Sequence, residues 1–235
     1  MARNPGRPPI INAPPWVTGI ALVLLAAHAI RVFLPSGMQD SLLWETALFP
    51  ERFWSWAGAS MPPGAAEPYA NVFAALATLL TTGLVHSDWV HVGLNAAMLL
   101  GVGKPVYEYL ERTGPEERNR AGYVFLLLFL VSVAGGSVAH LAANYPAGPP
   151  AIGASGGVSG LIAAVLLAQQ GARPRFLSRP FLGASLVFLV ANVVLAVVGP
   201  SMMGAGIAWQ AHVGGYVAGA LACRFVMWRR EGIAV

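Results

Sequence analysis

The chain has 235 residues, of which 56% are hydrophobic and 10% are charged. Soluble domains carry about 25% charged residues, so this composition excludes an ordinary water-soluble protein. The formal net charge of +4 does not indicate a nucleic-acid partner, because the basic residues lie in short segments between apolar runs and form no single patch. The one cysteine, Cys223, excludes a disulfide framework and a thiolate metal site.

Six apolar runs follow one another along the chain, and a bilayer span takes about 20 residues. Lipid offers no partners for backbone N–H and C=O groups, so we expect these runs to be helices. The sequence therefore predicts an all-α membrane protein, a six-helix bundle in which segments 1–15 and 229–235 flank a core at 16–228. The runs cover residues 16–34, 90–107, 122–143, 153–169, 181–198 and 207–226.

The first run follows Arg3 and Arg7, as the apolar part of a signal peptide would. It is too long for that, and no small-residue cleavage site follows it, so we expect a retained first span. Lys and Arg occur after the second, fourth and sixth runs and are absent from the loops after the third and fifth. The positive-inside rule then predicts cytoplasmic termini. The Ala, Gly and Arg bias favours a bacterial inner membrane.

Two connecting segments are open to more than one interpretation. Residues 35–89 contain several aromatic residues among Pro and Gly, which predicts a structured loop at the non-cytoplasmic interface whose aromatic residues either anchor it as an ordinary aromatic belt or contribute to substrate binding. Residues 199–206 are rich in Gly, which predicts either a lid over a site or a plain connector.

Polar side chains are costly inside a membrane and are therefore candidates for function. His91 and Asn95 share one face of the second predicted span, because four residues make about one helical turn. Ser155 opens the fourth span and His212 opens the sixth. With the predicted topology, these three helix ends lie at one depth on the non-cytoplasmic side.

The fourth and sixth spans carry matching small-residue faces, Gly156 with Gly160 and Gly215 with Gly219, which favour close packing of two helices. If these faces meet, Ser155 Oγ reaches a ring nitrogen of His212, as nucleophilic catalysis requires. The third to sixth spans contain no Asp or Glu, which predicts a Ser-His dyad in place of a triad.

An acyl-transfer reaction also needs hydrogen-bond donors for the oxyanion that develops on the substrate. The side chains of His91 and Asn95 are suitable donors. The backbone N–H of Ser155 is another, because the first turn of a helix leaves its N–H groups unpaired.

These motifs, in this order and on these spans, resemble those of rhomboid intramembrane serine proteases: His91-x-x-x-Asn95, Gly153-Ala-Ser155-Gly156 and Ala211-His212-x-x-Gly215-x-x-x-Gly219. The resemblance covers residues 16–228. It implies that Ser155 is the nucleophile, His212 the general base and acid, and His91 and Asn95 part of the oxyanion hole. It further implies single-pass transmembrane proteins as substrates, and no cofactor or metal.

The chain departs from the family pattern at two places. Many relatives have a Trp-Arg pair upstream of the second span, where this chain has Thr78 and Leu79. An aromatic residue often follows the nucleophile by one turn, where this chain has Ser159. Ser159 stands in a second Gly-x-Ser-Gly match and is the rival nucleophile. His86 belongs either to the polar mouth of the site or to the structural framework.

Other functions fit the residues less well. A metalloprotease would need ligands such as His-Glu-x-x-His, and an intramembrane aspartyl protease would need paired aspartates in spans, whereas Asp40 and Asp88 are in loops. A transporter would carry ionisable residues near the midplane. The alternative that remains open is a rhomboid-like pseudoprotease that binds membrane proteins without cleaving them. Such a protein would be expected to lack the serine or the histidine.

Overall fold

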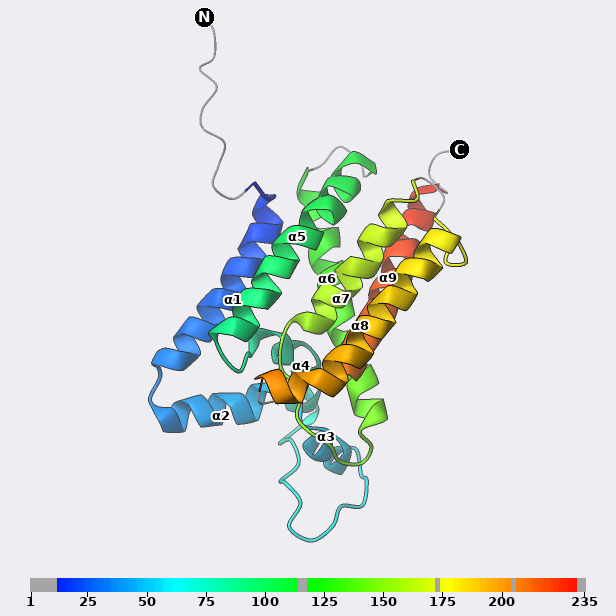
Figure 1. The fold of residues 1–235 in the computed structure, drawn as a ribbon. Coiled ribbons are helices and arrows are strands. Elements are labelled where there is room, and N and C mark those ends of the chain that lie inside the picture. The colour runs from blue at the N-terminus through cyan, green and yellow to red at the C-terminus, as the bar shows by residue number, and fades with distance from the viewer. Residues whose placement is uncertain (1–11, 114–117, 172–173, 204–205, 232–235) are drawn as a thin grey trace, which may run out of the picture.

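The computed structural model describes residues 12–113, 118–171, 174–203 and 206–231, which form helices joined by loops (Figure 1). In this part of the chain, the isolated bridge between Leu48 and Ala151 is the only β pairing. Six long helices match the six predicted runs, so the predicted all-α bundle is confirmed. They are α1 (Pro15–Phe33), α5 (Trp89–Thr113), α6 (Arg118–Ala143), α7 (Ser155–Ala168), α8 (Arg179–Met203) and α9 (Trp209–Glu231).

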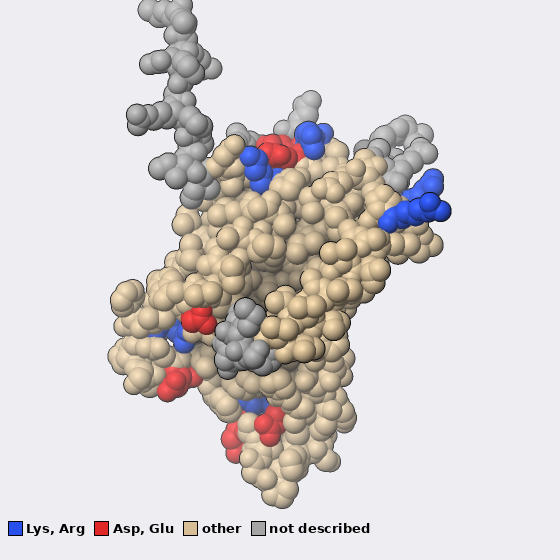
Figure 2. Space-filling view, viewed as in Figure 1, with Lys and Arg blue, Asp and Glu red and all other residues tan. Residues whose placement is uncertain are grey.

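Three of these helices are long and apolar enough to cross a membrane by length and composition alone, namely α1, residues 120–143 of α6 and residues 179–199 of α8. The other three lie outside this set, because α7 has only 14 residues and α5 and α9 include several charged residues. Charged side chains on the face drawn in Figure 2 gather at the two ends of the molecule and leave a band between them free of charge. This band is the surface expected to face hydrocarbon.

The beginning of α1 and the end of α9 lie at one end of the bundle, and the elements of the long first loop lie toward the other (Figure 1). This loop contains α2 (Ser36–Thr46), α3 (Pro50–Trp56), α4 (Val72–Thr81) and a short 3-10 helix, η1 (Thr82–Leu84). The segment 35–89 is thus structured, as predicted, while the role of its aromatic residues stays a prediction. Sequence analysis did not separate α4 from the loop, because its ten apolar residues are too few for a span.

Arg52 anchors this loop, although the loop contains no Trp-Arg pair. The Arg52 side chain is buried and donates to the carbonyl oxygens of Trp44 and, at 3.0 Å, Glu67. Its guanidinium carbon lies 4.3 and 4.2 Å from the ring centres of Trp44 and Tyr69. Hydrogen bonds and ring faces together compensate a charge removed from water. The anchor is therefore a residue on α3, upstream of the Thr78 position where the family motif was sought.

Three predicted segments fall wholly or partly outside the described residues. Of the flanking segments 1–15 and 229–235, residues 1–11 and 232–235 are not described. The predicted connector at 199–206 begins later than expected, since α8 continues to Met203, and residues 204–205 are not described.

α7 is the central helix, because nine of its 14 residues are buried and it packs against α5, α6 and α9. A Cβ atom added to Gly215 would collide with the backbone of Gly156, and one added to Gly219 would collide with the backbone of Gly160. Residue numbers increase in the same direction from the pair Gly156–Gly215 to the pair Gly160–Gly219, so α7 and α9 run parallel. The predicted packing of the small-residue faces is confirmed.

We expect Gly215→Ala to destabilise the protein by about 1–3 kcal/mol, because the new methyl group overpacks a backbone contact that has no flexible side chain to yield. The matched control is Gly101→Ala in α5, where an added Cβ meets nothing within 4 Å. This control should leave the thermal unfolding midpoint in detergent unchanged or slightly raised, since alanine favours the helix. Equal midpoints for the two variants would contradict the importance of this contact.

Candidate active site

Ser155 begins α7, and the shortness of this helix sets its depth. Fourteen residues span about 21 Å, which is about 9 Å less than the hydrocarbon core of a bilayer. If the polar residues Gln169 and Gln170 after α7 lie at one interface, this length places Ser155 inside the apolar layer.

The structure brings together Ser155 and His212, which sequence analysis expected to meet. Ser155 Oγ lies 2.8 Å from His212 Nε2. The other ring nitrogen, Nδ1, lies 2.7 Å from Oδ1 of Asn192 on α8. The Asn192 amide nitrogen donates to the Phe188 carbonyl oxygen at 2.9 Å, which fixes Oδ1 toward the ring. Because Oδ1 can only accept, His212 carries its proton on Nδ1, and Nε2 is free to accept the serine proton.

Sequence analysis missed Asn192. Its search for a third residue considered only Asp and Glu. A signal existed, because Asn192 and Ser185 are the only polar side chains in the run 181–198. The cost of a polar group in lipid marks both as candidates, but the sequence does not reveal which of them faces the histidine.

The segment before Ser155 is held by the first loop. Ala151 exchanges two backbone hydrogen bonds with Leu48, at 2.9 and 3.2 Å. The N–H of Gly153 donates to the Thr82 carbonyl oxygen at 2.9 Å, and the N–H of Ala154 donates to His86 Nε2 at 3.3 Å. His86 is fully buried and supports the backbone one residue before Ser155, which favours its structural interpretation.

His91 lies directly beside the motif that contains the serine. Gly153 has a positive φ of 110°, and a Cβ atom there would lie 2.7 Å from His91 Nε2. Glycine is thus required both by the backbone and by the ring next to it. Asn95 is buried and donates from its amide nitrogen to the His91 carbonyl oxygen at 3.0 Å, which leaves its second amide hydrogen available.

The proton on His91 is set by Ser87 and Asp88. Ser87 Oγ lies 2.6 Å from Asp88 Oδ2 and 3.1 Å from His91 Nδ1. The hydroxyl donates to the carboxylate and thereby holds the pKa of Asp88 below its ordinary value. Ser87 has no second hydrogen, so His91 Nδ1 must donate to it. The neutral ring then has a bare Nε2, and this atom becomes a donor only in the imidazolium form.

Ser159, the rival nucleophile, is buried one turn further along α7. Both ring nitrogens of His212 already have partners in Ser155 and Asn192. Among the described residues, Ser159 makes no hydrogen bond to the histidine. The arrangement favours Ser155.

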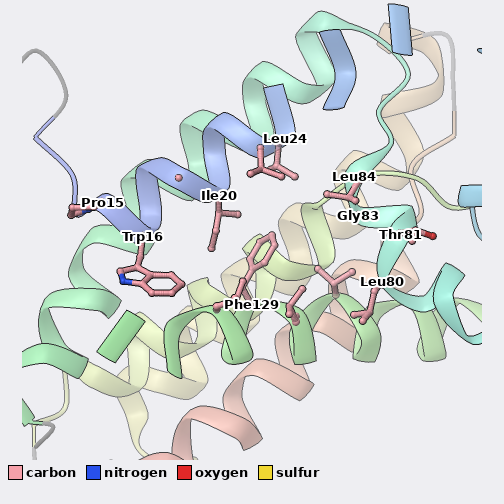
Figure 3. A pocket seen from close by; sticks show the side chains of 14 residues that line it. Pro15, Trp16, Ile20, Leu24, Leu80, Thr81, Gly83, Leu84 and Phe129 are labelled. Atoms are coloured by element: carbon pink, nitrogen blue, oxygen red, sulfur yellow. The ribbon is translucent and has the colours of Figure 1, made fainter. Parts of the chain in front are cut away.

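A cavity of about 20 Å³ lies beside Ser155, with Thr82 and Ser137 among its lining residues. This volume is enough for about one water molecule. A much larger cavity of about 550 Å³ lies elsewhere, between α1, α6 and the α4–η1 segment (Figure 3). Side chains such as Trp16, Ile20 and Phe129 line it, and it offers no group suited to catalysis. Within the described ranges, no three His, Cys, Asp or Glu residues are placed to hold a metal.

Fold and site together define a helical membrane protein with a serine and a histidine in hydrogen-bond contact near the starts of α7 and α9. A family comparison agrees with this description: the Rhomboid domain matches residues 74–229, which is more than half of the chain. The chain therefore belongs to the rhomboid family, whose members are generally intramembrane serine proteases. A comparison with curated proteins gives no match.

The role of His86 predicts a pH dependence of stability. Burial lowers its pKa from 6.5 to about 4, so the unfolded chain takes up a proton in this interval that the folded protein does not. The contribution of His86 is therefore present above about pH 6.5 and is lost as the pH falls toward about 4, by about 3 kcal/mol in total.

We expect His86→Gln, whose side-chain oxygen is an acceptor in a similar place, to lose less stability on acidification than the wild type. Unfolding midpoints in detergent at about pH 7 and about pH 4.5 measure this difference. An identical decrease in both proteins would contradict the assignment.

Proposed function

We propose that this protein is an intramembrane serine endopeptidase that uses Ser155 as nucleophile and His212 as general base and acid. The observation that carries the proposal is the 2.8 Å contact between Ser155 Oγ and His212 Nε2, with the acceptor Asn192 Oδ1 at the opposite ring nitrogen. A serine hydroxyl is a weak nucleophile unless an adjacent base accepts its proton. Membership of the rhomboid family supports the same chemistry.

The reaction follows from these two side chains. Ser155 Oγ attacks the peptide carbonyl carbon while its proton passes to His212 Nε2. The tetrahedral intermediate then breaks its C–N bond, and Nε2 gives this proton to the leaving amine. A water molecule next attacks the acyl carbon and gives a proton to Nε2. When the ester C–O bond breaks, that proton returns to Ser155. The small cavity beside Ser155 is a suitable position for this water.

Asn95 and the Ser155 backbone N–H are the proposed donors to the oxyanion. Asn95 keeps one amide hydrogen free, and the Ser155 N–H has no acceptor within its helix. His91 joins them from Nε2 when its ring is protonated, with the Asp88 carboxylate linked to the ring through Ser87. Donors fixed in advance in a dry site stabilise the oxyanion more than water does.

The proposed substrates are single-pass membrane proteins cut in or near their transmembrane helix. Because a helix protects its peptide carbonyls, the substrate must unwind locally before Ser155 can reach one. The charge distribution of the sequence favours cytoplasmic termini and a site that opens to the non-cytoplasmic side of a bacterial inner membrane. In the bundle, the Ser155 end of α7 lies away from the end that holds the beginning of α1 and the end of α9 (Figure 1).

The alternative is a rhomboid-like pseudoprotease that binds membrane proteins without cleavage. A binding protein has no need for a serine hydroxyl at hydrogen-bond distance from a histidine with a defined tautomer. The contact between Ser155 and His212 therefore favours the protease.

We expect Ser155→Ala to abolish both labelling by a fluorophosphonate probe and cleavage of a model transmembrane substrate, a loss of roughly 10⁴-fold or more. His212→Ala should have a similar effect, whereas Ser159→Ala should retain labelling. Labelling that persists in Ser155→Ala and disappears in Ser159→Ala would move the nucleophile to Ser159. A folded wild type that is neither labelled nor active would favour the pseudoprotease.

Loss of the Asn95 amide should lower kcat by about 10²- to 10³-fold with little change in KM, because its donor acts on the transition state. The matched control for Asn95→Ala is Asn144→Ala. Asn144 also donates from its amide to the carbonyl of a histidine four residues earlier, His140, at 2.8 Å, but lies outside the site. Equal kcat values for the two variants in the cleavage assay would contradict the role of Asn95.

A further inference from the structure

α8 exposes most of its surface, with one polar exception near its middle. Within residues 179–199, the buried positions are Phe181, Asn192 and Gly199. Asn192 is 4% exposed, and its neighbours Val190, Val193 and Val194 are exposed. A polar amide on a helix that otherwise faces lipid costs free energy, and it is expected to have a partner or a function.

The partner of Asn192 is the proposed general base. Its Oδ1 lies 2.7 Å from His212 Nδ1, and its amide nitrogen is held by the Phe188 carbonyl oxygen. Ser155, His212 and Asn192 thus form a continuous chain of hydrogen bonds from α7 through α9 to α8. In such a chain the third residue fixes the tautomer and the orientation of the imidazole and does not itself exchange protons.

We propose that Asn192 is a positioning residue that makes the Ser155–His212 pair a Ser-His-Asn triad. This inference rests on the proposed protease function. Asn192 acts through His212: it keeps the proton on Nδ1, so that Nε2 stays unprotonated and faces the serine. Ser155 Oγ on its own could hydrogen-bond to either tautomer of the ring, whereas the carbonyl-type oxygen of Asn192 accepts only from a protonated Nδ1.

Other contacts at the same helix pair do not replace this role. The aromatic rings that α8 and α9 contribute there, Phe188 and Tyr216, stack on each other with centroids 4.4 Å apart. Ser185 bonds to the Tyr216 hydroxyl at 2.7 Å. These contacts attach α8 to α9 without holding the imidazole. The orientation of the base therefore depends on Asn192, and the triad is complete only while α8 is docked on α9.

The test compares three variants of the full-length protein in detergent, using the fluorophosphonate probe and a model transmembrane substrate. Asn192→Leu has a similar shape and no acceptor. Asn192→Asp keeps an oxygen at the same place. Ser185→Ala is the matched control, because it removes a hydrogen bond of the same length, 2.7 Å, between the same two helices without touching His212.

We expect Asn192→Leu to lower kcat by about 10- to 100-fold with KM nearly unchanged, and to slow labelling of Ser155 to a similar extent. Asn192→Asp should retain kcat within about threefold of the wild type, and Ser185→Ala should do the same. If Asn192 had a structural role alone, Asn192→Leu and Ser185→Ala would lower kcat equally, or Asn192→Leu and Asn192→Asp would do so. Either result would overturn the inference while leaving the protease intact.

A second measurement does not depend on turnover or on the folding of a variant. Nitrogen-15 NMR of histidine-labelled wild type should find the Nδ1-protonated tautomer of His212. The Nε2-protonated tautomer would overturn the inference. Absence of Ser155-dependent cleavage in the wild type would instead remove the proposed function, and this inference with it.

Discussion

The close approach of α7 and α9 is the contact on which the site depends. Gly215 lies on the backbone of Gly156 and Gly219 on that of Gly160, so a single methyl group would separate the helices. Apolar side chains gain little by leaving lipid for a protein interior, and membrane helices therefore associate through close van der Waals packing of small residues. Here that packing brings the start of each helix to the same place, where Ser155 meets His212.

The loop between α1 and α5 completes the site from outside the bundle. It holds the segment before Ser155 at three points. Leu48 pairs with the backbone of Ala151. The Thr82 carbonyl oxygen accepts from the N–H of Gly153, and the His86 ring accepts from the N–H of Ala154. Arg52 in turn holds the loop. A serine at the first position of a helix would otherwise share the fraying of helix ends, and a catalytic group must keep its position within about 0.5 Å. A large loop is thus used to fix a small segment.

Polar groups in this apolar chain are few, and six of those around the site lie in two chains of hydrogen bonds. One chain joins Ser155, His212 and Asn192, and a second joins His91, Ser87 and Asp88. The first defines an acceptor for the serine proton, and the second controls whether His91 can donate. In the neutral form of both rings, His212 Nε2 faces the serine as an acceptor, and His91 Nε2 has no proton to donate.

The sequence by itself determined the apolar runs and the small-residue faces, because hydropathy and residue type report these directly, and it named Ser155, His212, His91 and Asn95 as candidates. The boundaries of the helices and the existence of α4 were harder to predict from the sequence, since an apolar helix of ten residues has no sequence pattern of its own. Only the tertiary structure decided that Arg52 anchors the loop, that His86 supports Ala154 and that Asn192 meets His212. A helix that is apolar around its whole circumference has no hydrophobic face from which its rotation can be read. The packing of α8 on α9 sets that rotation, and with it the third partner of the serine and histidine.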